Sequence, residues 1–143
     1  MNPVVISVIA LVISLVSLGW QVITWLRSGP VIKVKGHAAI PVVNENPGEL
    51  HLSVTAVNRG RAPATITGWG LRLPNGSSVV PRSAELPGVN PLPHRLESHA
   101  ESSWYILHAA LEEAAQTHQV ELSQLRPFVD VSGRGRVLGK PLG

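Results

Sequence analysis

Residues 4–26 form an uninterrupted run of 23 positions without a charged side chain. A helix of about 20 apolar residues spans the hydrocarbon core of a bilayer and satisfies every backbone hydrogen-bonding group internally. No basic side chain precedes the run, and the segment 27–30 (Arg-Ser-Gly-Pro) does not resemble a signal-peptide cleavage site. The sequence therefore predicts a retained single-pass transmembrane anchor over residues 1–27 and one further domain over residues 28–143.

The residues around the C-terminal end of this run predict its orientation. Trp20 and Trp25 lie where indole rings prefer the headgroup region, and Arg27, Lys33 and Lys35 follow on the C-terminal side. The positive-inside rule then predicts a cytoplasmic domain and an N-terminus outside. The reverse arrangement, with an exported domain, stays open, and the lack of cysteine is compatible with either side.

Small and polar residues recur within the apolar run at alternating spacings of three and four. They are Ser7, Ala10, Ser14, Ser17, Gln21 and Thr24. At about 100° per residue these positions stay within an arc of roughly 100°. Small residues let two membrane helices approach closely, and a lone amide in lipid needs a hydrogen-bond partner. The stripe predicts a seam for a homo-oligomer or for another membrane protein. Hydroxyls bonded to their own helix, or a pore-lining stripe, are the alternatives.

The remainder of the chain has the length of one domain and the pattern of short strands separated by turn residues. The expected strands are 31–35 (ended by Gly36), 38–43, 50–58, 64–73, 78–80, 102–107, 128–131 and 136–138. Residues 108–119 are rich in helix formers. The pattern predicts a mainly β fold, an immunoglobulin-like β-sandwich with one inserted helix, preceded by the single N-terminal transmembrane α-helix.

Three segments of this domain carry a resemblance. They read VTAVNRGRAPATITGWGLRLPNG, PLPHRLESHAESSWYI and RPFVDVSGRGRV. The chain resembles uncharacterised actinobacterial membrane-anchored proteins that have an immunoglobulin- or fibronectin-like β-sandwich. The resemblance covers most of residues 31–138 and rests on the patterns V-x-N-x-G-R, PLP-x-x-L-E and D-x-x-G-R, which mark turns and strand ends. It implies a fold and a non-enzymatic role.

Histidines are the only candidates for a catalytic or metal site. His94 and His99 have four residues between them, a spacing also found in zinc sites, but an odd separation of five puts two rings on opposite faces of a strand. Cysteine is absent, and Asp130 is the only aspartate. We therefore expect no catalytic, cofactor-binding or metal-binding residue, no cofactor and no enzyme activity. A tethered metal-dependent hydrolase that uses His94, His99 and Glu97 is the less favoured alternative.

The charge balance favours contact with lipid over contact with nucleic acid. Twelve Lys and Arg against nine acidic residues give a net charge of +3, and only one Tyr and one Phe are available for stacking on bases. We interpret the chain as a membrane-anchored interaction or assembly module, a subunit or accessory of a membrane complex. The edge strand 31–35 would accept a partner strand. A small oligomeric pore-forming or membrane-perturbing protein of phage type is the alternative.

Overall fold

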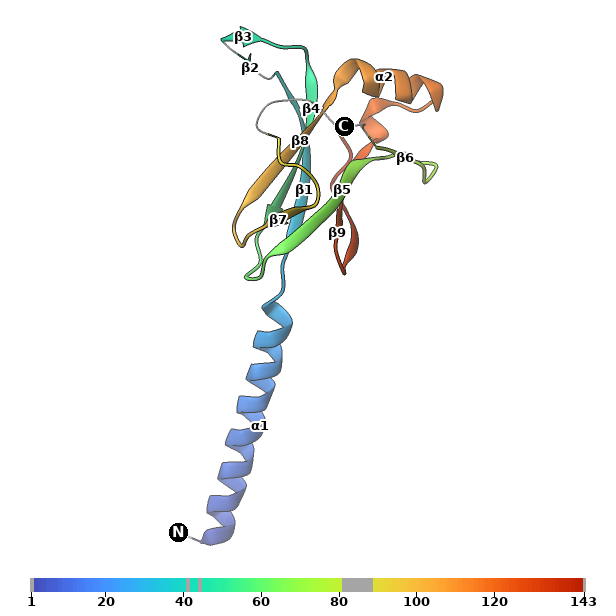
Figure 1. Cartoon of the computed structure of the whole chain (residues 1–143). Helices are drawn as coiled ribbons and strands as arrows, with labels where there is room; N and C mark the ends of the chain where they lie inside the picture. The colour runs from blue at the N-terminus through green and yellow to red at the C-terminus, as the bar shows by residue number, and fades with distance from the viewer. Residues whose placement is uncertain (1, 41, 44, 81–88, 143) are drawn as a thin grey trace.

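Helix α1 (Pro3–Arg27) projects away from the β-rich part of the chain in the computed structural model, which describes residues 2–40, 42–43, 45–80 and 89–142 (Figure 1). The Asn2 side chain caps the first turn by accepting a hydrogen bond from the Val4 amide at 3.1 Å. No residue of α1 is buried. Within the described residues this is the one helix long and apolar enough to cross a membrane, as the sequence predicts.

The strands form two antiparallel sheets and a separate short hairpin. The first sheet contains β1 (Ile32–Ala39), β4 (His51–Asn58) and β8 (Glu101–Leu107), in the order β1-β4-β8. The second contains β10 (Gly135–Leu138), β9 (Arg126–Val131), β5 (Ala64–Arg72) and β6 (Ser78–Val79), in that order, with β7 (His94–Leu96) paired to β5. The hairpin pairs β2 (Val42–Val43) with β3 (Asn46–Pro47). The structure confirms a mainly β fold behind an N-terminal apolar helix.

The core lies between the two sheets. Alternation along β8 points Ser102, Trp104 and Ile106 inward. They meet Val54 of β4 and Ile66 of β5, both fully buried. The indole Nε1 of Trp104 donates to the Asn90 carbonyl oxygen at 3.1 Å, so burying this large ring leaves no polar atom unsatisfied.

Helix α2 (His108–Thr117) follows β8 directly and buries Leu111 and Ala115. It ends two residues before the predicted end at residue 119. Gln119 has a φ of 54°, and the Val120 amide donates to the Ala115 carbonyl oxygen at 3.0 Å. This is a Schellman motif, in which a left-handed residue just after the helix satisfies its last carbonyl groups. A short 3-10 helix (Leu122–Gln124) leads into β9.

The first strand is longer than predicted, because Gly36 does not end it. Strand β1 continues to Ala39, and Gly36 pairs with Val54 inside the ladder. A Cβ atom at Gly36 would come within 2.6 Å of the Leu142 side chain and 3.3 Å of that of Pro127. Glycine is therefore present here so that the C-terminal segment can pack closely on the strand, and not to make a turn.

Candidate functional site at the membrane junction

Asn58, the last residue of β4, joins the chain segments where α1 meets the β domain. Its side chain is fully buried and makes four hydrogen bonds. Oδ1 accepts from the amides of Gly60 at 3.0 Å and Val31 at 3.3 Å. Nδ2 donates to the carbonyl oxygens of Ala62 at 2.8 Å and Leu96 at 3.2 Å. One side chain thus holds the last residue of the helix linker, the β4–β5 loop and strand β7.

Backbone contacts fasten the four-residue linker 28–31 to the same place. The Arg59 amide donates to the Val31 carbonyl oxygen at 2.8 Å. From the β9–β10 turn, Nη1 of Arg134 donates to the Pro30 carbonyl oxygen at 3.0 Å. A Cβ atom at Gly60 would collide with the backbone of residues 29–31. The linker therefore lies in a tight, hydrogen-bonded seat, which we call the junction clamp and define by Asn58, Gly60 and Arg134.

The outer face of the first sheet, directed away from the core, becomes basic next to the junction clamp. Lys33 and Lys35 alternate with buried Val34, so both side chains are on this outer face. The register opposes Lys33 to Val57, and Arg59, two residues after Val57, continues the same side of β4. All three cations are exposed. No salt bridge joins any of them to another residue in the described part of the chain.

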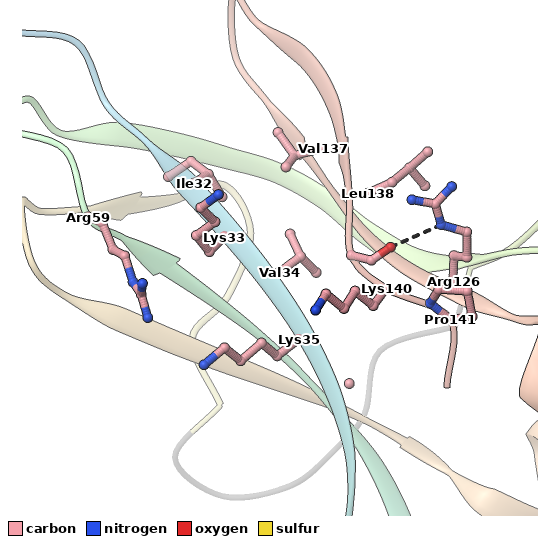
Figure 2. A pocket seen from close by; sticks show the side chains of 12 residues that line it. Ile32, Lys33, Val34, Lys35, Arg59, Arg126, Val137, Leu138, Lys140 and Pro141 are labelled. Atoms are coloured by element: carbon pink, nitrogen blue, oxygen red, sulfur yellow. Dashed lines mark hydrogen bonds between the residues drawn. The ribbon is translucent and has the colours of Figure 1, made fainter. Parts of the chain in front are cut away.

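A groove of about 570 Å³ runs along β1 from these cations to the C-terminal segment. Figure 2 shows Lys35 and Arg59 extending to the same side of β1, with Lys140 and Arg126 on the other side. The Arg126 Nε donates to the Gly139 carbonyl oxygen at 3.0 Å. Five basic residues therefore line the groove, and its lining includes no acidic residue.

The charges of the domain are distributed unevenly along its long direction. The β4–β5 loop and the β9–β10 turn lie at the end nearest α1, whereas α2 and the β2–β3 hairpin lie at the far end (Figure 1). Basic residues in the near half are Arg27, Lys33, Arg59, Arg61, Arg95, Arg134 and Arg136, and they outnumber the acidic residues there, which are Glu97, Glu101 and Asp130. The acidic residues in the far half are Glu45, Glu49, Glu112, Glu113 and Glu121, and they outnumber the basic Arg72 and Arg126. The end nearest the helix is thus positive, and the opposite end is negative.

The polar stripe of α1 lies along one side of an unbroken helix. Three of its hydroxyls donate to the carbonyl oxygen four residues earlier, each at 2.9 Å; they belong to Ser7, Ser14 and Thr24. A hydroxyl bonded in this way is satisfied inside its own helix. Neither Ser17 nor the amide of Gln21 has such a side-chain bond within the described residues. Gln21 is therefore the stripe residue with the largest unmet hydrogen-bonding capacity in lipid.

The anchor side chains at the end of α1 are exposed, with Trp20 at 72% and Trp25 at 74%. Both indoles therefore extend outward from the helix, where a bilayer would surround them. Arg27 follows in the last turn. Positions 20, 25 and 27 thus present an interfacial pattern of aromatic and basic groups on the helix surface.

The residues of the alternative metal site are not gathered. His94 packs edge-on against Trp104 with ring centroids 6.3 Å apart. The Glu97 carboxylate pairs with Arg95 at 2.7 Å, and His99 has a φ of 61° in a turn. No group of three histidine, cysteine or acidic residues suited to a metal occurs among the described residues.

Comparisons of the chain with protein families, with curated proteins and with solved structures give no match. The resemblance to actinobacterial membrane-anchored proteins stays a prediction. The structure does explain one of the patterns on which it rests. In V-x-N-x-G-R, the asparagine is Asn58, the glycine is Gly60 and the arginine is Arg61, whereas Ala56 stands at the valine position and Val57 follows it. The first two belong to the junction clamp, so the pattern describes a seat for the preceding helix as well as a turn.

Proposed function

We propose that this protein is a single-pass membrane protein whose immunoglobulin-like domain is an interaction or assembly module, with α1 pairing to a second copy or to another membrane subunit. The domain would lie in the cytoplasm, with the N-terminus outside. The role is non-enzymatic. The module would act as a subunit or accessory of a membrane complex.

The observation that carries this proposal is the junction clamp. A tether that only concentrates a domain at a membrane works with a flexible linker. Here four residues separate the end of α1 from β1, and Asn58, Gly60 and Arg134 hold them. A rigid joint transmits the arrangement of the helices to the domains. Such a joint suits a protein whose helix contacts specify how its domains assemble.

The strand order supports the immunoglobulin-like assignment. In that architecture strands A, B and E form one sheet, and strands C, F and G form the other. The order β1-β4-β8 corresponds to A-B-E, and β5-β9-β10 corresponds to C-F-G. Such sandwiches serve as recognition domains on many unrelated proteins, so the fold alone assigns no partner. The edges of β1 and β10 have no further strand paired to them within the described residues, which leaves positions for strand addition.

The polar stripe supports helix pairing through Gln21. Interhelical hydrogen bonds of polar residues in membranes contribute about 0.6 to 1.7 kcal/mol. Replacing both Gln21 and Ser14 by Leu should therefore weaken association in detergent roughly three- to twenty-fold. The measurement is energy transfer between chains labelled at a single cysteine placed at Asn75, an exposed turn residue in a chain without cysteine.

A matched control changes the opposite side of the helix. Val12 and Ile23 lie there by the 100° spacing, so the pair V12L and I23L alters side-chain shape without touching the stripe. We expect this control to associate as the unmodified chain does. Equal association of the Gln21/Ser14 variant and the unmodified chain would exclude the stripe as the pairing surface.

A further inference from the structure

Lys33 lies between two further outer-face cations, Lys35 along its own strand and Arg59 across the ladder, and is close enough to repel each of them. Lys33 and Lys35 are two residues apart on one strand, which places their Cα atoms about 7 Å apart. Arg59 is diagonal to Lys33 across the β1–β4 pair, at about 7 to 8 Å. The acidic residue on this face nearest to Lys33 is Glu101, two strands away beyond Val57, and it forms no salt bridge with the cations. An anion bound between the three groups would relieve their repulsion.

The side chains that border the cluster suit phosphate better than an aromatic ligand. Lys35 lies in one row with Thr55 and Ser103, whose hydroxyl oxygens are 2.7 Å apart. A cation cluster bordered by hydroxyls is the set of groups that binds phosphate oxygens. Bases or other aromatic ligands would need stacking partners, and the groove lining contains no aromatic residue.

The position of the cluster points to the membrane as the source of the phosphate. Lys33 lies six positions after Arg27, so their Cα atoms are at most about 20 Å apart. Arg59 is closer still, because its amide is bonded to Val31. The junction clamp prevents the linker from carrying these groups farther from the bilayer. Anionic lipid attracts basic groups that come within about a Debye length, 8 to 10 Å, of the headgroups, a range that the cluster enters when the near end of the domain meets the bilayer.

We propose that Lys33, Lys35 and Arg59 bind the phosphate groups of anionic phospholipids at the surface of the membrane that holds α1. The near end of the β domain then docks on the bilayer, and its acidic far end, which carries α2, is directed away from it. This contact is independent of pairing through the polar stripe, since it uses different residues on a different part of the chain.

The test uses the full chain in a neutral detergent at low salt. Native mass spectrometry counts bound short-chain phosphatidylglycerol and phosphatidylcholine over a range of lipid concentrations. Each basic group near an anionic surface contributes about fivefold to binding, so the variant K33Q/K35Q should bind phosphatidylglycerol roughly thirty-fold more weakly. The charge-matched control R72Q/R95Q removes two exposed arginines outside the cluster and should bind like the unmodified chain. R59Q alone should lose about fivefold.

Several results would overturn the proposal. Equal binding of the two lipids by the unmodified chain, or equal phosphatidylglycerol binding by K33Q/K35Q and R72Q/R95Q, would remove the cluster as a lipid site. If pyrophosphate binds and phosphatidylglycerol does not, the cluster is a site for a soluble phosphate. If polyglutamate binds and the lipid does not, the cluster is a site for an acidic protein partner. Unchanged tryptophan fluorescence of the variants verifies folding, and if K33Q/K35Q fails this check, R59Q decides the outcome.

Discussion

Replacing Asn58 by Ala removes the centre of the junction clamp, and the loss of its four hydrogen bonds sets the decrease in the free energy of unfolding. The two shorter hydrogen bonds, from the Gly60 amide at 3.0 Å and to the Ala62 carbonyl at 2.8 Å, contribute about 1.5 kcal/mol each in a fully buried site. The two longer bonds, from the Val31 amide and to the Leu96 carbonyl, contribute about 0.5 kcal/mol each. The free energy of unfolding should therefore fall by about 4 kcal/mol. That is a large part of the 5 to 15 kcal/mol that stabilises a typical domain.

The assay is urea unfolding of the full chain in detergent, followed by tryptophan fluorescence. Trp20 and Trp25 are first replaced by Phe, so that only the buried Trp69 and Trp104 contribute to the signal. With a urea dependence of about 2 kcal/mol per molar, the unfolding midpoint should fall by about 2 M.

The control for Asn58→Ala is Asn75→Ala. Asn75 is also a turn asparagine, but it is exposed and makes one side-chain hydrogen bond, from the Ser77 amide at 2.9 Å. Its replacement should cost less than about 1 kcal/mol. If Asn58→Ala cost no more than this control, the clamp would not be a stabilising element, and the argument for a rigid joint would fail with it.

Two further predictions concern the junction and the orientation. Gly60→Ala should lower the free energy of unfolding by about 2 kcal/mol or more and speed tryptic cleavage after Arg27, because the added Cβ meets the linker backbone. The control is Gly19→Ala, since Gly19 has open space around it. Equal cleavage rates of the two variants would contradict the clamp. A single cysteine at Asn75 should be protected from a membrane-impermeant maleimide in intact cells and labelled after lysis; labelling before lysis would place the domain outside.

The sequence was sufficient to predict the elements whose signals are local. The apolar run 4–26 lies within α1, and period-two patterns located β4, β5, β8 and β9. The helix after β8 was also predicted, although its last two residues were wrong. These signals depend on residues close in the chain, so the hydrophobic pattern and the helix or strand propensities are enough to identify them.

The junction clamp was beyond prediction because its partners are distant in the chain. An asparagine followed by Gly two residues later indicates a turn, and turn asparagines are commonly exposed. Burial of Asn58 depends on Val31 and Leu96, which lie 27 and 38 residues away. The basic cluster was beyond prediction for the same reason. The two lysines were visible as charges that follow the anchor, but Arg59 joins them only through the register between β1 and β4, which a hydrophobic pattern does not specify to one residue.

The seated linker also determines the relation between helix rotation and domain direction. A freely jointed anchor lets a domain swivel, so the side on which two helices touch has no influence on the domains above them. Here a turn of α1 about its own axis would turn the β domain with it, because Ser28, Pro30 and Val31 are hydrogen-bonded and Gly29 packs against the Arg134 side chain. Moving the helix contact by one residue, about 100° around the axis, would therefore bring a different face of each domain toward its neighbour. In a pair of copies joined through α1, the direction around the helix axis at which the two helices meet would therefore also be the direction at which their β domains meet.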